Sequence, residues 1–130
     1  MIDLDDFITQ YVAAWNESDP HARRKWIAGT WSEQASLFNR LNEYHGHAGI
    51  EDAVRRSYEL FVARGFLFRP RQKPASHHEA VQFTWEMITP DDGEVDSVGT
   101  QFLILDDDGR IRLDYQFIEQ PPTPPAPERR

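Results

Sequence analysis

The first part of the chain places its hydrophobic residues at a helical period. The stripe consists of Leu4, Phe7, Ile8, Tyr11, Val12 and Trp15. Intervals of three and four residues fall on one face of a helix, so we predict a helix over residues 3–17. Asp3, Asp5 and Asp6 lie in its first turn, where the helix dipole favours negative charge.

Two further helices are predicted from start and stop signals. The first covers about residues 20–29, with Ser18 or Asp19 as its N-cap and a proline in its first turn. The second covers residues 48–64, where the helical period returns, and it ends at Gly65 as a helix with a glycine C-cap does.

The rest of the chain changes to a period of two, which is typical of strands. A short strand is expected within residues 35–46, "ASLFNRLNEYHG", with a turn around Asn42. Four longer strands are predicted over residues 66–72, 78–89, 95–105 and 110–119. The strings "TPDDGE" and "DDDGR" separate the last three and supply the Asp and Gly that hairpins need.

This order of elements predicts an α+β fold. Strands that follow one another along the chain form one antiparallel sheet, and the helices can cover only one of its faces. A curved sheet wrapped around the N-terminal helices would leave a cone-shaped α+β barrel with an internal pocket. We expect a single domain over residues 1–119. Residues 120–130 contain five prolines and are expected to form a disordered tail.

Composition narrows the possible partners. The chain has 130 residues and a net charge of −8, which repels phosphate backbones and makes a nucleic-acid partner improbable. It contains no cysteine, so neither a disulfide nor a thiolate site is available. No apolar stretch is long enough to span a membrane, and the first residues are acidic where a signal peptide would be basic. We therefore expect a cytoplasmic protein that contacts neither membrane nor nucleic acid.

The five histidines do not predict a metal site. His45 and His47 are two residues apart, whereas His77 and His78 are adjacent and cannot point the same way. No His-Glu-x-x-His spacing is present, so we expect no metal and no cofactor. One of the adjacent pair, His77, remains a secondary candidate for acid–base chemistry.

Four strings resemble the nuclear transport factor 2-like superfamily, in particular its SnoaL-like branch. They are "YVAAWNESD", "HGHAGIEDAV", "VQFTWEM" and "DDDGRIRLDYQFIE", and together they span nearly the whole chain before the tail. The resemblance implies a cystatin-like cone, in which a curved sheet wraps a long helix around a pocket, and a homodimer formed through the convex face of the sheet. It leaves the activity open, because the superfamily holds isomerases, polyketide cyclases, dehydratases, epoxide hydrolases and binding proteins.

The resemblance also extends to the steroid isomerases of the same fold. It places Tyr11 where those enzymes keep a phenol that stabilises an oxyanion. The position of their general base matches Asn39, whose amide has no useful basicity, and the position of their neutral acid matches Thr100. Two of the three groups are therefore missing, which argues against steroid isomerisation by that mechanism.

The strand phases follow from the same comparison. Val81, Phe83, Trp85 and Met87 are expected to point inward, in agreement with simple alternation. In the last strand the two criteria conflict. Alternation alone would bury Ile111, Leu113, Tyr115 and Phe117. The resemblance instead points Arg112, Asp114, Gln116 and Ile118 into the pocket. Both hold if the apolar row is a homodimer interface, because such a row would be a large exposed patch on a monomer.

Our leading hypothesis is an enclosed aromatic pocket for a small hydrophobic carbonyl compound, with cofactor-free isomerase, cyclase or dehydratase chemistry. The predicted catalytic residues are Asp114, Tyr11 and His77. The predicted substrate-binding residues are Trp15, Asn39, Phe83, Trp85, Met87, Thr100 and Gln116. Gln116 matches the acid–base aspartate of SnoaL-like cyclases, and Asp114 lies one inward step away.

Plainer interpretations stay open beside this hypothesis. Tyr11 could be a core aromatic, Asn39 could satisfy backbone groups, and Asp114 could be a surface acid paired with Arg112. At the level of function, the alternatives are a non-catalytic binding or structural module and an epoxide hydrolase. The hydrolase would need an Asp–Arg–Asp set such as Asp96, Arg112 and Asp114.

Overall fold

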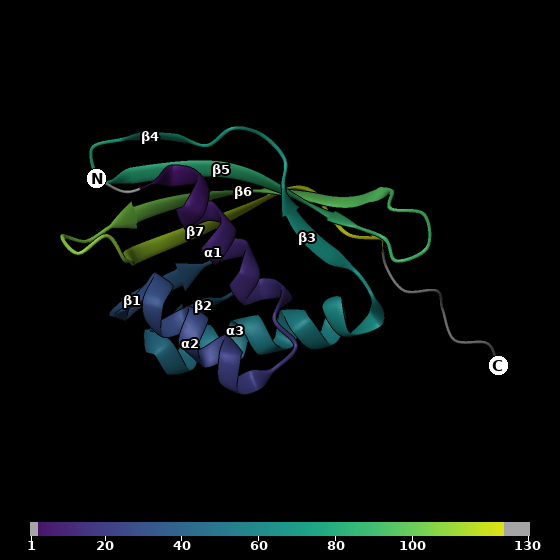
Figure 1. Cartoon of the computed structure of the whole chain (residues 1–130), viewed down its shortest axis with the longest axis horizontal. Coiled ribbons are helices and arrows are strands. Elements are labelled where there is room, and N and C mark those ends of the chain that lie inside the picture. The colour runs from purple at the N-terminus through teal and green to yellow at the C-terminus, as the bar shows by residue number, and fades with distance from the viewer. Residues whose placement is uncertain (1–2, 124–130) are drawn as a thin grey trace.

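A computed structural model describes residues 3–123 of the chain, as three α-helices, one short 3-10 helix and a curved sheet of seven strands (Figure 1). The helices are α1 (Leu4–Asn16), α2 (Pro20–Thr30), α3 (Gly46–Leu60) and the 3-10 helix η1 (Val62–Arg64). The strands are β1 (Trp31–Phe38), β2 (Glu43–His45), β3 (Leu67–Pro70), β4 (Ala75–His77), β5 (Ala80–Ile88), β6 (Val95–Leu105) and β7 (Ile111–Gln120). The predicted α+β class is confirmed.

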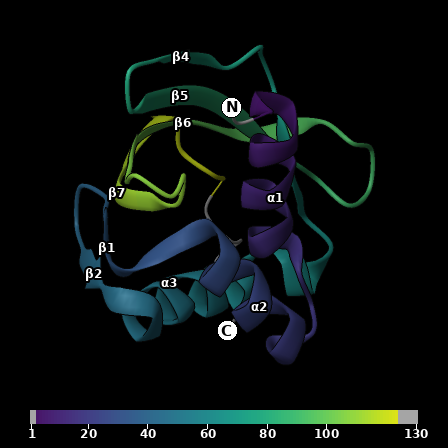
Figure 2. The same ribbon diagram turned by 60° about the vertical axis from the view of Figure 1, so that its left-hand side comes forward.

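The sheet has the strand order β2-β1-β7-β6-β5-β3, and β4 adds to β5. It bends toward the helices, with α1 and α3 on its concave side (Figure 2). One detail of the prediction is wrong, because β1 pairs with β7 in parallel and the sheet is therefore mixed. The sheet is also open, since β2 and β3 form its two ends, and it does not close into a barrel.

Capping residues fix where the helices begin. Asp3 caps α1 by accepting a hydrogen bond from the backbone N–H of Asp6 at 3.1 Å. Asp19, and not Ser18, caps α2, and its carboxylate accepts from the N–H groups of His21 and Ala22. The predicted C-terminus of the third helix is partly wrong. Its α-helical part ends at Leu60, and the left-handed Gly65, with φ of 98°, closes η1 instead.

Two strands differ from the prediction because their periodicity is broken. β1 starts at Trp31, directly after α2, although a strand was expected only from Ala35. Its pairing with β7 shifts between Trp31 and Ser36, which interrupts the alternation of buried positions. β4 was not predicted at all. Its three residues are all exposed, so its sequence carries no hydrophobic signal.

The inward phase of β5 is confirmed. Val81, Phe83, Trp85 and Met87 are all buried and face the stripe of α1 that contains Phe7, Ile8, Tyr11 and Val12. These residues belong to one continuous core.

The last strand resolves the conflict between the two predicted phases, and both were partly wrong. Ile111 is fully buried and belongs to the core, so it cannot be part of an outer interface. Leu105 pairs with Ile111 whereas Ile104 pairs with Leu113, which makes Arg112 an extra, exposed residue. This bulge lets Ile111 and Asp114 both point inward, although they are three residues apart.

The described part of the C-terminus follows the sheet. Gln120 still belongs to β7, and Thr123 donates hydrogen bonds from its N–H and its hydroxyl to the carboxylate of Asp96. The remainder of the predicted tail, residues 124–130, lies outside the described residues. Within residues 3–123, no helix is both long enough and apolar enough to cross a membrane.

Candidate ligand-binding site

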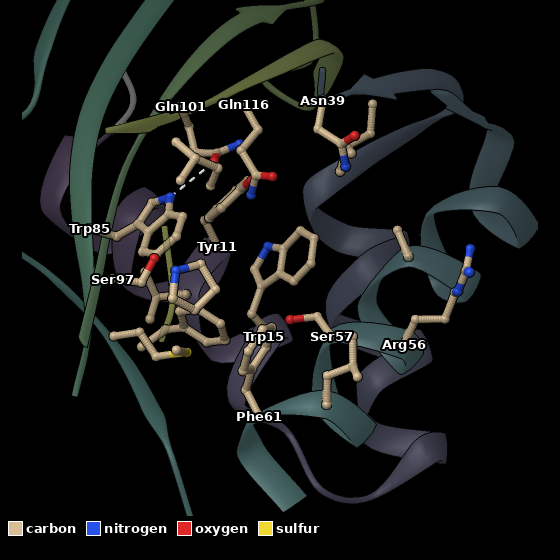
Figure 3. A pocket seen from close by; sticks show the side chains of 18 of the residues that line it. Tyr11, Trp15, Asn39, Arg56, Ser57, Phe61, Trp85, Ser97, Gln101 and Gln116 are labelled. Carbon is tan, nitrogen blue, oxygen red and sulfur yellow. Dashed lines mark hydrogen bonds between the residues drawn. The ribbon is translucent and has the colours of Figure 1, made fainter. Parts of the chain in front are cut away.

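A cavity of about 290 Å³ lies between α1, α3 and the concave face of the sheet (Figure 3). Six of the predicted site residues line it, namely Tyr11, Trp15, Asn39, Trp85, Met87 and Gln116. The volume is at the small end of the range for ligand pockets, and aromatic and aliphatic side chains make up most of the wall. Among the lining residues, all of which belong to the described range, there is no His, Asp, Glu or Lys.

Asp114 lies behind the cavity wall and is fully buried. Its Oδ2 accepts hydrogen bonds from the Tyr11 hydroxyl at 2.8 Å and from Trp31 Nε1 at 3.1 Å. Its Oδ1 accepts from Gln101 Nε2 at 2.6 Å. Burial raises the pKa of Asp114 to about 6, and the three hydrogen bonds limit the rise because they favour the carboxylate. Asp114 is therefore neither a surface acid nor a partner of Arg112.

The hydroxyl of Tyr11 donates its proton in a hydrogen bond to this carboxylate. Burial raises the pKa of Tyr11 well above its usual value, and the neighbouring charge of Asp114 raises it further. The N–H groups of Trp15 and Gln101 lie close enough to oppose part of that rise. Because its proton points at Asp114, Tyr11 presents acceptor lone pairs, and not a free donor, to its remaining neighbours.

Trp15 contributes an unused donor to the same wall. Its Nε1 is buried and has no hydrogen-bond partner among the described residues. Figure 3 shows the indole nitrogen on the side of the ring that faces Tyr11 and Gln101. A buried N–H without a partner costs about 1–3 kcal/mol, so a ligand oxygen placed there would relieve a real penalty.

Gln101 lines the cavity although the sequence did not predict it, whereas the predicted Thr100 does not line it. Gln101 lines the cavity, accepts a hydrogen bond from Trp85 Nε1 at 2.9 Å and donates to Asp114. Thr100 lies on the opposite face, where its hydroxyl donates to Glu119. The signal was present in the hairpin: Gln101 pairs with Phe83, so the inward phase of β5 fixes that of β6.

Two other predicted residues lie away from the cavity. His77 is exposed on β4, its ring lies against that of His78, and it does not line the cavity, contrary to the prediction that it serves the pocket. It belongs to a strand beyond β5, on the far side from the helices (Figure 1). Phe83 is buried one layer behind the wall, with its ring centroid 5.1 Å from that of Tyr11.

Asn39 satisfies backbone groups and also lies at the cavity wall. Its Oδ1 accepts from the backbone N–H groups of Leu41 and Asn42, which organises the turn between β1 and β2. Its side chain also lines the cavity, near Gln116 in Figure 3.

The epoxide hydrolase set is not assembled. Arg112 is exposed, and the carboxylate of Asp96 accepts hydrogen bonds from Thr123. Neither residue takes part in the hydrogen bonds of Asp114. Over residues 3–123, no group of three or more His, Asp or Glu side chains is placed to hold a metal ion.

Comparisons with known proteins support the fold assignment. No family model and no curated protein matches the sequence. A candidate isomerase of the SnoaL-like family from Agrobacterium tumefaciens is similar in structure, with a TM-score of 0.83 and 28% identity over 92% of this chain and 99% of that chain.

Two more distant structures share the fold alone. A candidate polyketide cyclase from Sinorhizobium meliloti has a TM-score of 0.66 and 16% identity, over 88% of this chain and 96% of that one. A nuclear transport factor 2-like protein of unknown function from an Exiguobacterium species has a TM-score of 0.68 and 18% identity, over 87% and 98%.

Proposed function

We propose that this chain, which has the nuclear transport factor 2-like fold and resembles the SnoaL-like branch of that superfamily, binds an apolar carbonyl compound and catalyses proton transfer next to the carbonyl. The observation that carries the proposal is the unpaired Trp15 N–H beside the Tyr11–Asp114 pair in a largely apolar cavity. This arrangement supplies one donor for an oxygen and one route for a proton, without a cofactor.

The donor holds the carbonyl. Trp15 Nε1 makes no hydrogen bond of normal geometry among the described residues, although it lies near the Tyr11 hydroxyl, so a ligand oxygen can take its hydrogen bond in place of that weak approach. The rings of Trp85 and Trp15 and the side chain of Met87 give the apolar body of the ligand its contacts. As negative charge develops on the oxygen, the same N–H becomes a stronger, charge-assisted donor.

The base is the carboxylate of Asp114, which acts through Tyr11. The C–H bond next to the carbonyl breaks, its proton moves to Tyr11 Oη, and the proton of Tyr11 moves to Asp114 Oδ2. The electron pair of the broken bond goes to the carbonyl oxygen as an enolate, and returning the proton to another carbon gives isomerisation. A carboxylic acid with a pKa of about 6 has a stronger conjugate base than an ordinary aspartate, which suits this role near neutral pH.

The remaining polar groups keep the pair in place. Gln101 and Trp31 hold the two oxygens of Asp114, so the carboxylate cannot rotate away from Tyr11. Gln101 is in turn fixed by Trp85. Asn39 and Gln116 add amide donors to the cavity wall, where they can orient a polar substituent.

Deuterium exchange tests the proposal without knowledge of the natural substrate. We expect the acetyl methyl protons of 2-acetylnaphthalene to exchange in D₂O faster with the protein than in buffer, as followed by proton NMR. Tyr11→Phe and Asp114→Asn should each reduce the added rate by about a hundredfold. Tyr115→Phe, on the convex face, is the matched control and should leave the rate unchanged.

The pH profile identifies the role of Asp114. The relay needs the ionised carboxylate, so the exchange rate should rise with pH up to about 6 and then level off. A rate that instead falls above pH 6 would mean that a protonated Asp114 is required, and it would overturn the base role of the pair.

A non-catalytic binding protein is the second candidate, and one observation favours it. All three donors that meet Asp114 come from different elements, α1, β1 and β6, so the network also fixes the shape of the cavity. Binding of 2-acetylnaphthalene without any added exchange would support this function and exclude the catalytic one.

A further inference from the structure

Among the cavity-lining residues, all of which lie within the described part of the chain, Arg56 has the one cationic side chain. Ala53, Arg56, Ser57 and Leu60 line the cavity at positions i, i+3, i+4 and i+7 of α3, so they form one face of that helix. Arg56 and Leu60 are the exposed members of this face, and the Arg56 guanidinium lies 3.5 Å from the Tyr44 hydroxyl, another lining group.

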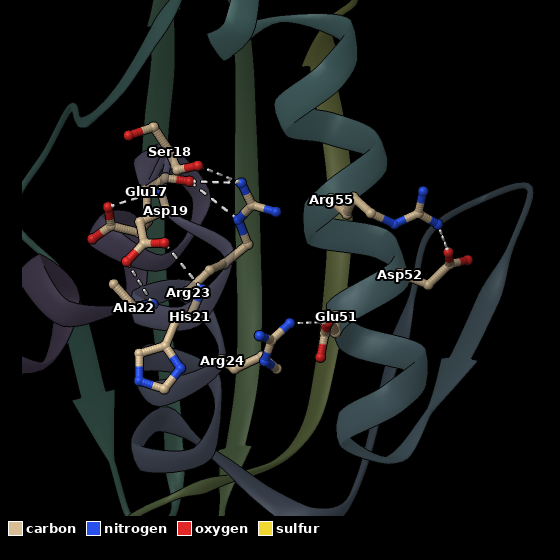
Figure 4. A network of polar contacts seen from close by, with 10 residues as sticks. All are labelled: Glu17, Ser18, Asp19, His21, Ala22, Arg23, Arg24, Glu51, Asp52 and Arg55. Atoms are coloured by element: carbon tan, nitrogen blue, oxygen red, sulfur yellow. Dashed lines mark hydrogen bonds and ion pairs between the residues drawn. The ribbon is translucent and has the colours of Figure 1, made fainter.

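Arg56 has no acidic partner within residues 3–123, although acids are close in sequence. Asp52, one turn earlier on α3, pairs with Arg55, and Glu59 pairs with Arg55 as well. Figure 4 shows the Arg55–Asp52 pair on α3, next to the contact between Arg24 and Glu51. Arg55 therefore draws both acids away from the cavity and leaves the charge of Arg56 uncompensated.

The cavity itself offers that charge no counterion. Asp114, the carboxylate behind the wall, is fully buried under Tyr11, Trp31 and Gln101. The other lining side chains are uncharged, and the polar ones among them include Asn39, Asn42 and Tyr44. The chain has a net charge of −8 and many acidic residues, yet none of those described pairs with Arg56.

We propose that the ligand is an apolar keto acid, or a carboxylic acid of similar shape, whose carboxylate binds Arg56 at the mouth while its carbonyl reaches Trp15. The inference rests on the proposed function, since it adds an anionic end to the carbonyl compound argued above. One guanidinium matches one carboxylate in charge and in its two-pronged geometry. The amides of Asn39 and Asn42 can complete the carboxylate's hydrogen bonds.

A pair of matched probes tests the charge preference. The first is 6-acetyl-2-naphthoate, which has a carboxylate and a ketone at opposite ends, and the second is its methyl ester. By isothermal titration calorimetry we expect the acid to bind about fivefold more tightly than the ester, as an ion pair at a half-open site allows. Raising the salt concentration from about 0.05 M to about 0.5 M should narrow the difference.

Variants assign the preference to Arg56. Arg56→Gln should abolish the preference for the acid and leave ester binding unchanged. Lys73→Gln makes the same change in net charge at an exposed loop position outside the cavity, so it should keep the preference. Gln is a good helix former, and thermal unfolding followed by circular dichroism confirms that Arg56→Gln remains folded.

The outcomes separate this inference from the proposed function. A preference for the acid that needs Arg56, without exchange of the acetyl protons, supports the inference and excludes catalysis. Exchange of the acetyl protons with equal affinity for acid and ester supports catalysis and overturns the inference. A preference that survives in Arg56→Gln also overturns it, and binding of neither probe overturns both proposals.

Discussion

At the scale of single residues, the centre of this protein is a carboxylate that three donors hold in a dry environment. Removal from water favours the neutral form of Asp114, while the hydrogen bonds from Tyr11, Trp31 and Gln101 favour the charged form. The effect of burial on the pKa is larger than that of the hydrogen bonds, so the pKa of Asp114 is raised to about 6, close to the pH at which cells work. Ionising such a buried acid lowers the free energy of unfolding, and a variant without the carboxylate can measure that loss.

The prediction concerns Asp114→Asn and the pH dependence of stability. In the folded state the pKa of Asp114 is raised to about 6, so the native protein holds this proton over a pH range in which the unfolded chain has lost it. Wild-type stability should therefore fall as pH rises from about 4 to about 6, relative to the variant. The relative loss should reach about 3 kcal/mol by pH 7. Urea unfolding of wild type and Asp114→Asn at pH 4 and at pH 7.5 measures this loss. If the difference in the free energy of unfolding between the two proteins were the same at both pH values, the raised pKa would be contradicted.

At the scale of elements, the pairing of β5 with β6 positions the site. Trp85 lies directly opposite Gly99, and its indole crosses the space that a side chain at Gly99 would occupy. The same indole then reaches Gln101, two residues along β6, and so connects the strand pair to the Asp114 network. A glycine within a strand marks such a close approach.

Gly99→Ala should therefore damage both stability and the site. A Cβ at this position would lie within 3.0 Å of three atoms of the Trp85 ring, which has to move. We expect a loss of about 1–3 kcal/mol in the free energy of unfolding and a shift of the Trp85 indole N–H resonance. Gly29→Ala, in α2 with no atom within 4 Å, is the control and should not destabilise. Equal stability of Gly99→Ala and wild type would contradict this close packing.

Regular helices and strands could be predicted from the sequence, whereas irregular strands could not. The first and third helices and the inward phase of β5 follow from periodicity, and the second helix follows from its start and stop signals; the structure confirms all of them apart from the C-terminal end of α3. The bulge at Arg112 and the register shift in β1 break that periodicity, so the phase of Ile111 and the start at Trp31 were not predictable from pattern alone. Tyr11 and Asp114 were found as candidates, but their contact joins residues 103 positions apart, and only the fold brings them together.

At the scale of the whole molecule, the two faces of the sheet differ in how far their apolar side chains are covered. The concave face is covered by helices, whereas the convex face leaves apolar side chains in contact with water. Phe117 is 59% exposed and Phe102 is 37% exposed, and Tyr115 stacks on Phe38 beside them. Tyr115 pairs with Phe102 across β6 and β7, so Phe38, Tyr115 and Phe102 form one continuous group.

We propose that this convex face forms a homodimer, with the predicted interface reduced to Leu113, Tyr115 and Phe117, because Ile111 lies in the core. A two-fold axis would place the same rings of both copies together and remove them from water. Light scattering after gel filtration should give twice the chain mass for wild type and a monomer for Phe117→Lys. Leu41→Lys makes the same kind of change at a 77% exposed residue of the β1–β2 turn and should remain dimeric. A monomeric wild type would refute the interface, and because the cavity opens on the other side of the sheet, it would leave the proposed site intact.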